Sequence, residues 1–205
     1  MQDRAIISSS SPPGTLLLSS CFRVFHSELS SLSDTEKGVT GVDLADFDRP
    51  LSLLVPPNNY LRHPVISGTR LLLLQVLTYL EWATRNIGAA SDALAAPLQR
   101  NCRYNAGIIG FSSGVISACV VGTSATLLDL LFNAASAFRV ALWIGVRTQS
   151  YRRRTLVASD DVRSWSRILL GIEHHAAEEA INRFVQQVNS PLTAKISTLN
   201  ITEAW

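Results

Sequence analysis

A five-residue segment near the middle of the chain, Gly110-Phe111-Ser112-Ser113-Gly114, fits two unrelated motifs. It fits G-x-S-x-G, in which a serine on a strained turn between a strand and a helix attacks an acyl group. It fits G-x-x-x-G equally well, the close-packing motif of transmembrane helices. A third possibility is an ordinary buried turn between a strand and a helix, with no chemical role.

The composition of the surrounding stretch favours the turn over the membrane helix. Residues 105–124 carry no charge, but serines, threonine and glycines are spread through them. So many small and polar residues give up most of the insertion energy that isoleucine and valine would supply. We therefore expect a short strand over 106–111, a turn at Ser112 and a helix from Ser113 onward.

Such a turn assigns a role to each residue of the motif. Ser112 would be the nucleophile, held in a strained backbone conformation. Gly110 and Gly114 would be small because strand and helix approach too closely for side chains at those positions. The backbone N–H of Ser113, at the helix start, would stabilise the oxyanion that forms during acyl transfer.

Charge and cysteine content limit the other function classes. The net charge of +2, from 18 basic and 16 acidic residues, gives no field that indicates nucleic acid as a partner. The basic cluster 151–154 is expected to be a solvated turn. Three widely spaced cysteines indicate neither a disulfide framework nor a metal site. The apolar run 5–7 is too short for a signal peptide, so we expect a cytoplasmic protein without a membrane partner.

Hydrophobic periodicity predicts mostly helices around the motif. Residues 1–14 are expected to form a loose N-terminus, because Pro12-Pro13-Gly14 punctuates the chain. The further predictions are helices over 15–32, from Pro64, from Thr126, over 160–171 and over 176–188, an irregular connector over 33–59 with room for one short helix, and a strand over 194–201.

Four segments in order and spacing resemble a known family. They are "HPVISGTRLLLLQVLTYLEW", "NAGIIGFSSGVISACVVGTS", "AFRVALWIGVR" and "WSRILLGI". Together they resemble the starter-unit acyl-carrier-protein transacylase domain of fungal non-reducing polyketide synthases, over residues 15–205. The resemblance implies an α/β fold with an α/β-hydrolase-like core of the malonyl-transacylase type.

The resemblance also implies an activity and its partners. A starter acyl group would pass from acyl-CoA or an acyl-phosphopantetheine thioester to the enzyme, and then to the phosphopantetheine arm of an acyl carrier protein. No bound cofactor is implied. The partners would be this carrier protein and the remaining domains of a polyketide synthase in secondary metabolism.

The resemblance places site residues on this sequence, with two departures. The family most often has cysteine where Ser112 stands, although serine serves in the related malonyl transacylases. Arg139 matches an arginine that binds the substrate carboxylate in those relatives, and a structural role near the pocket is an equal alternative. The catalytic histidine is not matched by any of the four histidines of the chain, His26, His63, His174 and His175.

These departures leave two hypotheses for the function. We expect a partial domain that is truncated before the ferredoxin-like subdomain of the family. It is either an acyltransferase or a non-catalytic interaction module derived from one. His174 and His175 are expected at the surface rather than at a metal, because adjacent helical residues point about 100° apart. His63 is expected to be structural, and Cys119 to be buried packing.

Overall fold

The long segments with helical periodicity form helices in the computed structural model, which describes residues 11–87, 108–155, 175–176, 178–179 and 182. The chain divides into two units, Met1–Ala158 and Ser159–Trp205. The described helices of the first unit are α2 (Pro12–Ser30), α3 (Asp34–Thr40), α4 (Pro64–Ile87), α6 (Gly114–Gly122) and α7 (Leu127–Thr155), with short 3₁₀ turns at Leu44–Asp46, Pro50–Leu53 and Asn58–Tyr60.

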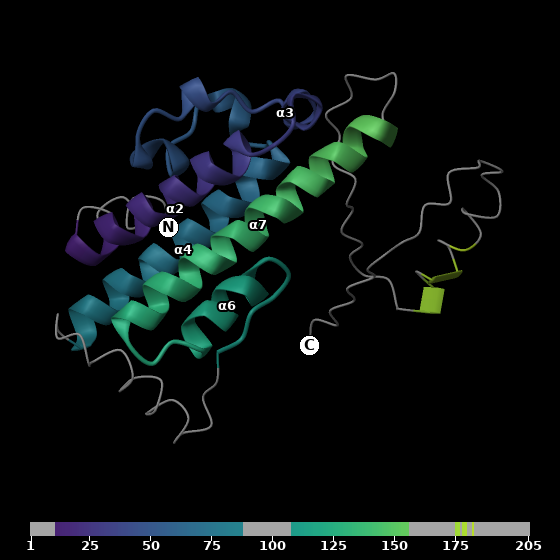
Figure 1. Cartoon of the computed structure of the whole chain (residues 1–205). Helices are drawn as coiled ribbons and strands as arrows, with labels where there is room; N and C mark the ends of the chain where they lie inside the picture. Colours follow the sequence, from purple (N-terminus) through teal and green to yellow (C-terminus); the bar gives the residue numbers. More distant parts are fainter. Residues whose placement is uncertain (1–10, 88–107, 156–174, 177, 180–181, 183–205) are drawn as a thin grey trace. The chain divides into compact units, whose positions relative to one another are not determined.

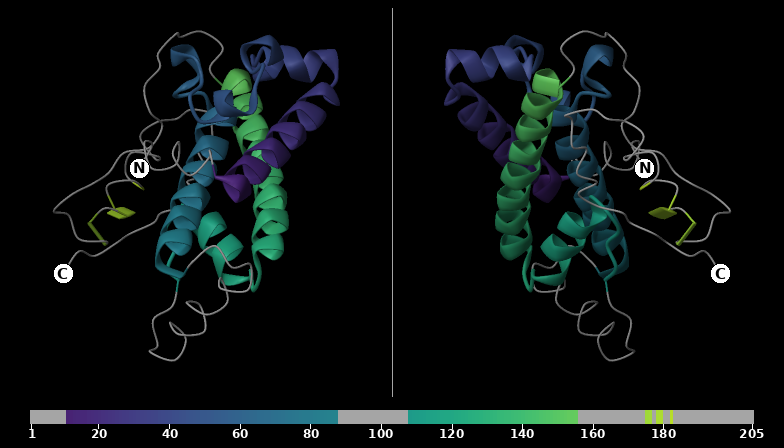
Figure 2. Two further views of the ribbon diagram at one scale, coloured as in Figure 1. Left: turned by 90° about the vertical axis from the view of Figure 1, so that its left-hand side faces the viewer. Right: turned by 90° about the vertical axis from the view of Figure 1, so that its right-hand side faces the viewer.

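The first unit is built around two long helices, α4 and α7. They lie side by side and run in opposite directions, and α2 crosses them (Figure 1, Figure 2). The short helix α6 packs against the C-terminal half of α4 and the N-terminal half of α7. The buried core between these helices includes the fully enclosed side chains of Phe25, Leu77 and Phe138.

One glycine permits the close contact between the two long helices. A Cβ atom at Gly145 of α7 would lie 2.6 Å from both the carbonyl oxygen of Pro64 and the Cα of Val65. Real side chains do not approach backbone atoms so closely, so only glycine fits at this crossing. It sits where the last third of α7 meets the first turn of α4.

Helix α2 begins at Pro12, earlier than the predicted start at residue 15. Pro12 and Pro13 occupy the first helical positions, and Ser11 caps the helix by accepting a hydrogen bond from the N–H of Gly14 at 3.2 Å. Proline is compatible with the first turn, because the N–H groups there have no partner within the helix. The prediction that these prolines form a turn outside the helix was therefore wrong.

The connector after α2 contains one short helix, as the sequence allowed, together with short 3₁₀ turns. Helix α3 starts with a capping box, in which the Ser33 hydroxyl accepts from the Glu36 N–H and the Glu36 carboxylate accepts from the Ser33 N–H. It ends at Gly41, whose φ of 66° lies in the left-handed region. Tyr60 stabilises the connector through two hydrogen bonds. Its hydroxyl donates to the Asp46 carboxylate at 2.8 Å and accepts from the Asp43 N–H at 3.1 Å.

The helix-rich character of the chain is confirmed, whereas no strand occurs in the described ranges. Ile108 to Phe111, the described part of the predicted strand, has irregular backbone structure. The predicted strand over 194–201 and the predicted helix over 160–171 lie outside the described residues. Of the predicted helix over 176–188, the positions 176, 178, 179 and 182 are described, and they are helical.

Helix α7 has both a buried and an exposed apolar face. Ala134, Phe138 and Ala141, which lie at helical spacing on one face, are buried. Apolar side chains on other faces, including Leu128, Phe132, Val140 and Ile144, are exposed. By length and composition alone, Leu127–Arg153 could also cross a membrane, and it is the one helix of the described part for which this holds. In the structure it packs against α2, α4 and α6.

His63, directly before α4, is expected to make the stability of the protein depend on pH. Its ring is partly buried, its Nδ1 atom is enclosed without a hydrogen bond, and the guanidinium groups of Arg153 and Arg152 lie nearby. Burial, and then these two charges, lower the pKa of His63 below the ordinary 6.5, although a hydrogen bond with the Thr40 backbone acts in the opposite direction. The folded protein therefore binds the proton less readily than the unfolded chain does.

The sign of the effect follows from proton linkage. As the pH falls through about 6.5, the unfolded chain takes up a proton at His63 before the folded protein does, so the free energy of unfolding decreases. Above that pH the contribution is fully present. Urea unfolding at pH 7.5 and 5.5 should show a smaller loss on acidification for His63→Gln than for the natural chain. An identical pH dependence in both proteins would contradict this role.

Candidate functional site

The turn before α6 holds Ser112 in an uncommon backbone conformation. Its φ is 54°, and no other described residue except glycine has a positive φ. The turn is closed by two backbone hydrogen bonds, from Gly114 N–H to Phe111 C=O at 2.9 Å and from Val115 N–H to Ser112 C=O at 3.1 Å. Left-handed backbone costs a non-glycine residue about 1 kcal/mol, and such strain is concentrated at functional sites. The Ser112 side chain is exposed at the tip of this turn.

The glycines on either side of Ser112 differ in their surroundings. A Cβ atom at Gly110 would lie 2.6 Å from the Cα of Val115 and 2.7 Å from the carbonyl carbon of Gly114. The segment before the turn therefore packs directly on the start of α6, as expected for Gly110. At Gly114 the nearest atom to a Cβ would be Nε2 of Gln75 at 3.8 Å, an ordinary contact. The expectation that a side chain at Gly114 would collide was wrong.

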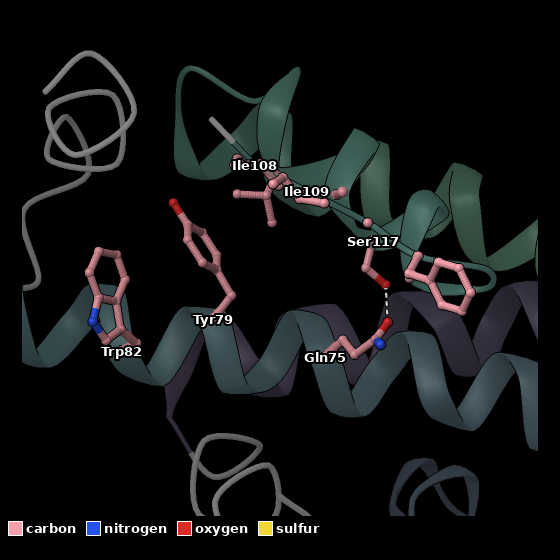
Figure 3. Close-up of a pocket in the computed structure, with 11 residues that line it drawn as sticks. Gln75, Tyr79, Trp82, Ile108, Ile109 and Ser117 are labelled. Atoms are coloured by element: carbon pink, nitrogen blue, oxygen red, sulfur yellow. Dashed lines mark hydrogen bonds between the residues drawn. The ribbon is translucent and has the colours of Figure 1, made fainter. Parts of the chain in front are cut away.

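A cavity of about 360 Å³ lies beside the turn. Three elements form its walls: α4, the segment before the turn and α6 (Figure 3). The lining residues are Gln75, Tyr79, Trp82, Ile108, Ile109, Gly110, Phe111, Gly114, Ser117, Ala118 and Val121. Ser112 is not among them, although Gly110, Phe111 and Gly114 of the same motif are.

Two polar side chains of the cavity wall, Gln75 and Tyr79, come from α4. Gln75 accepts a hydrogen bond from the Ser117 hydroxyl through its Oε1 atom, which joins α4 to α6 (Figure 3). One helical turn further along α4, the hydroxyl oxygen of Tyr79 is enclosed and has no hydrogen-bond partner among the described residues. Burial raises the pKa of Tyr79 above its ordinary value of 10, so the hydroxyl keeps its proton at neutral pH.

Arg139 does not line the cavity. Its Nε atom forms an ion pair with Oε1 of Glu28 on α2 at 2.7 Å, and the other carboxylate oxygen of Glu28 accepts from the Trp143 indole N–H at 2.9 Å. The guanidinium group of Arg147 lies 5.5 Å from the centre of the Trp143 ring. Arg139 thus joins α7 to α2, and its role in substrate binding remains a prediction.

The described histidines are also engaged elsewhere. Nε2 of His26 lies 2.8 Å from the carbonyl oxygen of Phe47, and His63 sits beside Thr40. In the second unit, His175 is exposed, and its Nδ1 atom lies 3.6 Å from Oε1 of Glu179. His174 lies outside the described residues. No described histidine lines the cavity.

Cys119, predicted to be buried packing, is exposed on α6. The helix is only nine residues long and turns one side toward α4 and α7, so residues on the opposite side remain uncovered. Cys21, by contrast, is completely buried in the core, and burial raises the pKa of its thiol to about 12. Of these two thiols, only that of Cys119 is open to reagents.

The sequence did not single out Gln75, Tyr79 or Trp82 as residues of a site. Tyr79 lies at helical spacing from Leu72, Val76 and Leu80, and residues three or four apart share a helix face. Those three are buried in the core. The one available signal was the polar character of Gln75 and Tyr79 in an otherwise leucine-rich helix.

Comparison with known proteins shows the family of the chain. The family described as "Starter unit:ACP transacylase in aflatoxin biosynthesis" matches residues 5–204. The orsellinic acid synthase of Armillaria ostoyae is 37% identical over 98% of this chain, and that of Beauveria bassiana is 28% identical over 95%. The atrochrysone carboxylic acid synthase of Passalora fulva is 25% identical over 64% of the chain.

The alignments cover a small part of those proteins. The chain spans 9% of the length of the two orsellinic acid synthases and 7% of the atrochrysone carboxylic acid synthase. No solved structure matches the chain. The match over nearly the whole sequence nevertheless determines the family: this chain belongs to the starter unit:ACP transacylases of fungal polyketide synthesis.

Proposed function

We propose that this chain is an acyltransferase domain that loads a starter acyl group from a thioester donor onto the phosphopantetheine arm of an acyl carrier protein. The observation that carries the proposal is the conformation of Ser112. It is exposed, has a φ of 54° and stands directly before the first turn of α6. Backbone strain is retained where function requires it, and in this family the function of such a turn is to present the nucleophile.

The reaction consists of two acyl transfers. The Ser112 Oγ attacks the thioester carbonyl, the carbon–sulfur bond breaks, and the donor leaves as a thiol with the serine proton. The phosphopantetheine thiol then attacks the carbonyl of the resulting ester, the bond between that carbon and the Ser112 Oγ breaks, and the proton of the thiol passes to the Ser112 Oγ. In both steps the Ser113 N–H, which has no acceptor among the described residues, donates to the oxyanion.

A base is needed to activate a serine hydroxyl. The lack of a histidine among the described cavity residues favours a second candidate function, a non-catalytic interaction module. Such a module would bind a carrier protein or other synthase domains through the same helices without forming a covalent intermediate. The two candidates therefore differ in whether an acyl group is ever attached to the chain.

The chain spans only a small part of its relatives, which supports placing it in a larger synthase. Its partners would be a carrier protein and the other domains of that synthase. The location would be the cytoplasm. The substrates would be acyl-CoA or acyl-phosphopantetheine, without a bound cofactor. An α/β-hydrolase-like core of the malonyl-transacylase type belongs to the same proposal.

The test is a transfer assay with hexanoyl-CoA and a carrier protein that bears phosphopantetheine. We expect hexanoyl carrier protein to form at a rate proportional to the concentration of the chain, above the rate without it. The Cys119→Ser variant should retain this rate, because the exposed thiol is not part of the proposed mechanism. Binding of the carrier protein without any transfer would instead support the interaction module.

A further inference from the structure

The cavity beside Ser112 is mostly apolar, and this limits what it can bind. Its lining includes the apolar side chains of Trp82, Ile108, Phe111 and Val121, and its volume of about 360 Å³ suits a small organic group. The segment that leads to the nucleophile forms one wall. An acyl group attached to Ser112 would therefore find an apolar space next to its point of attachment.

One polar group in this wall has no partner. The Tyr79 hydroxyl is enclosed and makes no hydrogen bond with any described residue, whereas Gln75 and Ser117 bond to each other. In Figure 3 the Tyr79 side chain rises from α4 between Trp82 and the Gln75–Ser117 pair. A buried hydroxyl without a partner is unfavourable, and a ligand oxygen would remove that cost.

The position of Tyr79 indicates where on an acyl chain this oxygen would lie. Gln75 marks the end of the cavity nearest the turn, because its Nε2 atom is 3.8 Å from the place of a Cβ at Gly114. Tyr79 follows four residues later, which corresponds to about 6 Å along the helix. An extended chain advances about 1.2 Å per bond, so Tyr79 lies about five bonds further from the turn than Gln75.

We propose that Tyr79 is a specificity-determining residue, whose hydroxyl donates a hydrogen bond to an oxygen on the distal part of a starter acyl group of about six carbons. The cavity then favours oxo-acyl groups over plain aliphatic ones of the same length. This inference rests on the proposed function, since it takes the acyl group to be carried by Ser112. The raised pKa of Tyr79 is consistent with the role, because the hydroxyl remains a donor.

The two ligands to compare are 5-oxohexanoyl-CoA and hexanoyl-CoA, which differ in one oxygen. Binding is measured by calorimetry in a Ser112→Ala background, where no acyl transfer to that residue can occur. We expect the oxo compound to bind about fivefold more tightly, which corresponds to one neutral hydrogen bond. In Tyr79→Phe the two dissociation constants should become equal.

Tyr60→Phe is the matched control. It removes a hydroxyl that bonds to Asp46 and Asp43 away from the cavity, so it should lower the melting temperature and leave the fivefold preference intact. Tyr79→Phe should melt at or above the temperature of the background protein, because its hydroxyl has no bond to lose.

Three results would overturn the inference: no preference in the background protein, no binding of either compound, or a preference that persists in Tyr79→Phe. Failure of the proposed function has a different signature. In that case the Tyr79-dependent preference is present, but the natural chain does not transfer either acyl group to a carrier protein.

Discussion

Replacing Gly110 by alanine is expected to destabilise the protein by about 3 kcal/mol and to abolish acyl transfer. The new methyl group would lie 2.6 Å from the Cα of Val115 and 2.7 Å from the carbonyl carbon of Gly114. Both are backbone atoms, so no side-chain rotation can relieve the overlap. The start of α6 must move away from the turn, and Ser112 and the Ser113 N–H move with it.

Gly114→Ala is the matched control for this prediction. It adds the same methyl group four residues away in the same motif, where the nearest atom is the flexible end of Gln75 at 3.8 Å. Its effect on the free energy of unfolding should stay within about 1 kcal/mol, since alanine also favours the helix. Urea unfolding and the transfer assay measure both variants. Equal losses in the two would show that the close packing at Gly110 is not what supports the site.

Substitutions of Ser112 are expected to abolish activity without lowering the stability of the protein. Ser112→Ala should lower the rate of acyl transfer about a thousandfold, because the nucleophile is removed, and should change the free energy of unfolding by less than about 0.5 kcal/mol. Ser112→Gly should be equally inactive but more stable by about 1 kcal/mol, because glycine adopts a φ of 54° without strain.

This pair of variants separates a functional from a structural serine. A residue kept for its chemistry retains its strain at a cost in stability, and glycine removes the strain and the activity together. If Ser112→Gly were less stable than the natural chain, the hydroxyl would be making a contact that supports the turn. If either variant kept the full transfer rate, Ser112 would not be the nucleophile.

The sequence was most informative at positions where the backbone or the packing permits few residue types. Gly110 and Ser112 were predicted from five residues, and the structure has the close packing at Gly110 and the positive φ at Ser112. The long helices α4 and α7 also followed from periodicity, because their apolar stripes have to face a core. The roles of Ser112 and Ser113 in acyl transfer remain predictions.

The sequence was less informative where the answer depends on neighbours from distant segments. Whether a side chain fits at Gly114 depends on Gln75, 39 positions earlier in the chain. The ion pair of Arg139 depends on Glu28, more than a hundred positions away. Tyr79 has the spacing of a core residue, and only the apposition of α4, α6 and the preceding segment makes it part of a cavity. Local patterns contain none of this information.

The central claim is that Ser112 carries the acyl group, and the most direct measurement is to locate that group. The chain is incubated with hexanoyl-CoA, quenched in acid, digested and examined by peptide mass. We expect one hexanoyl group on the peptide that contains Ser112, stable to neutral hydroxylamine as an oxygen ester and absent from Ser112→Ala. A hydroxylamine-labile label on Cys119, or a label that persists in Ser112→Ala, would contradict it.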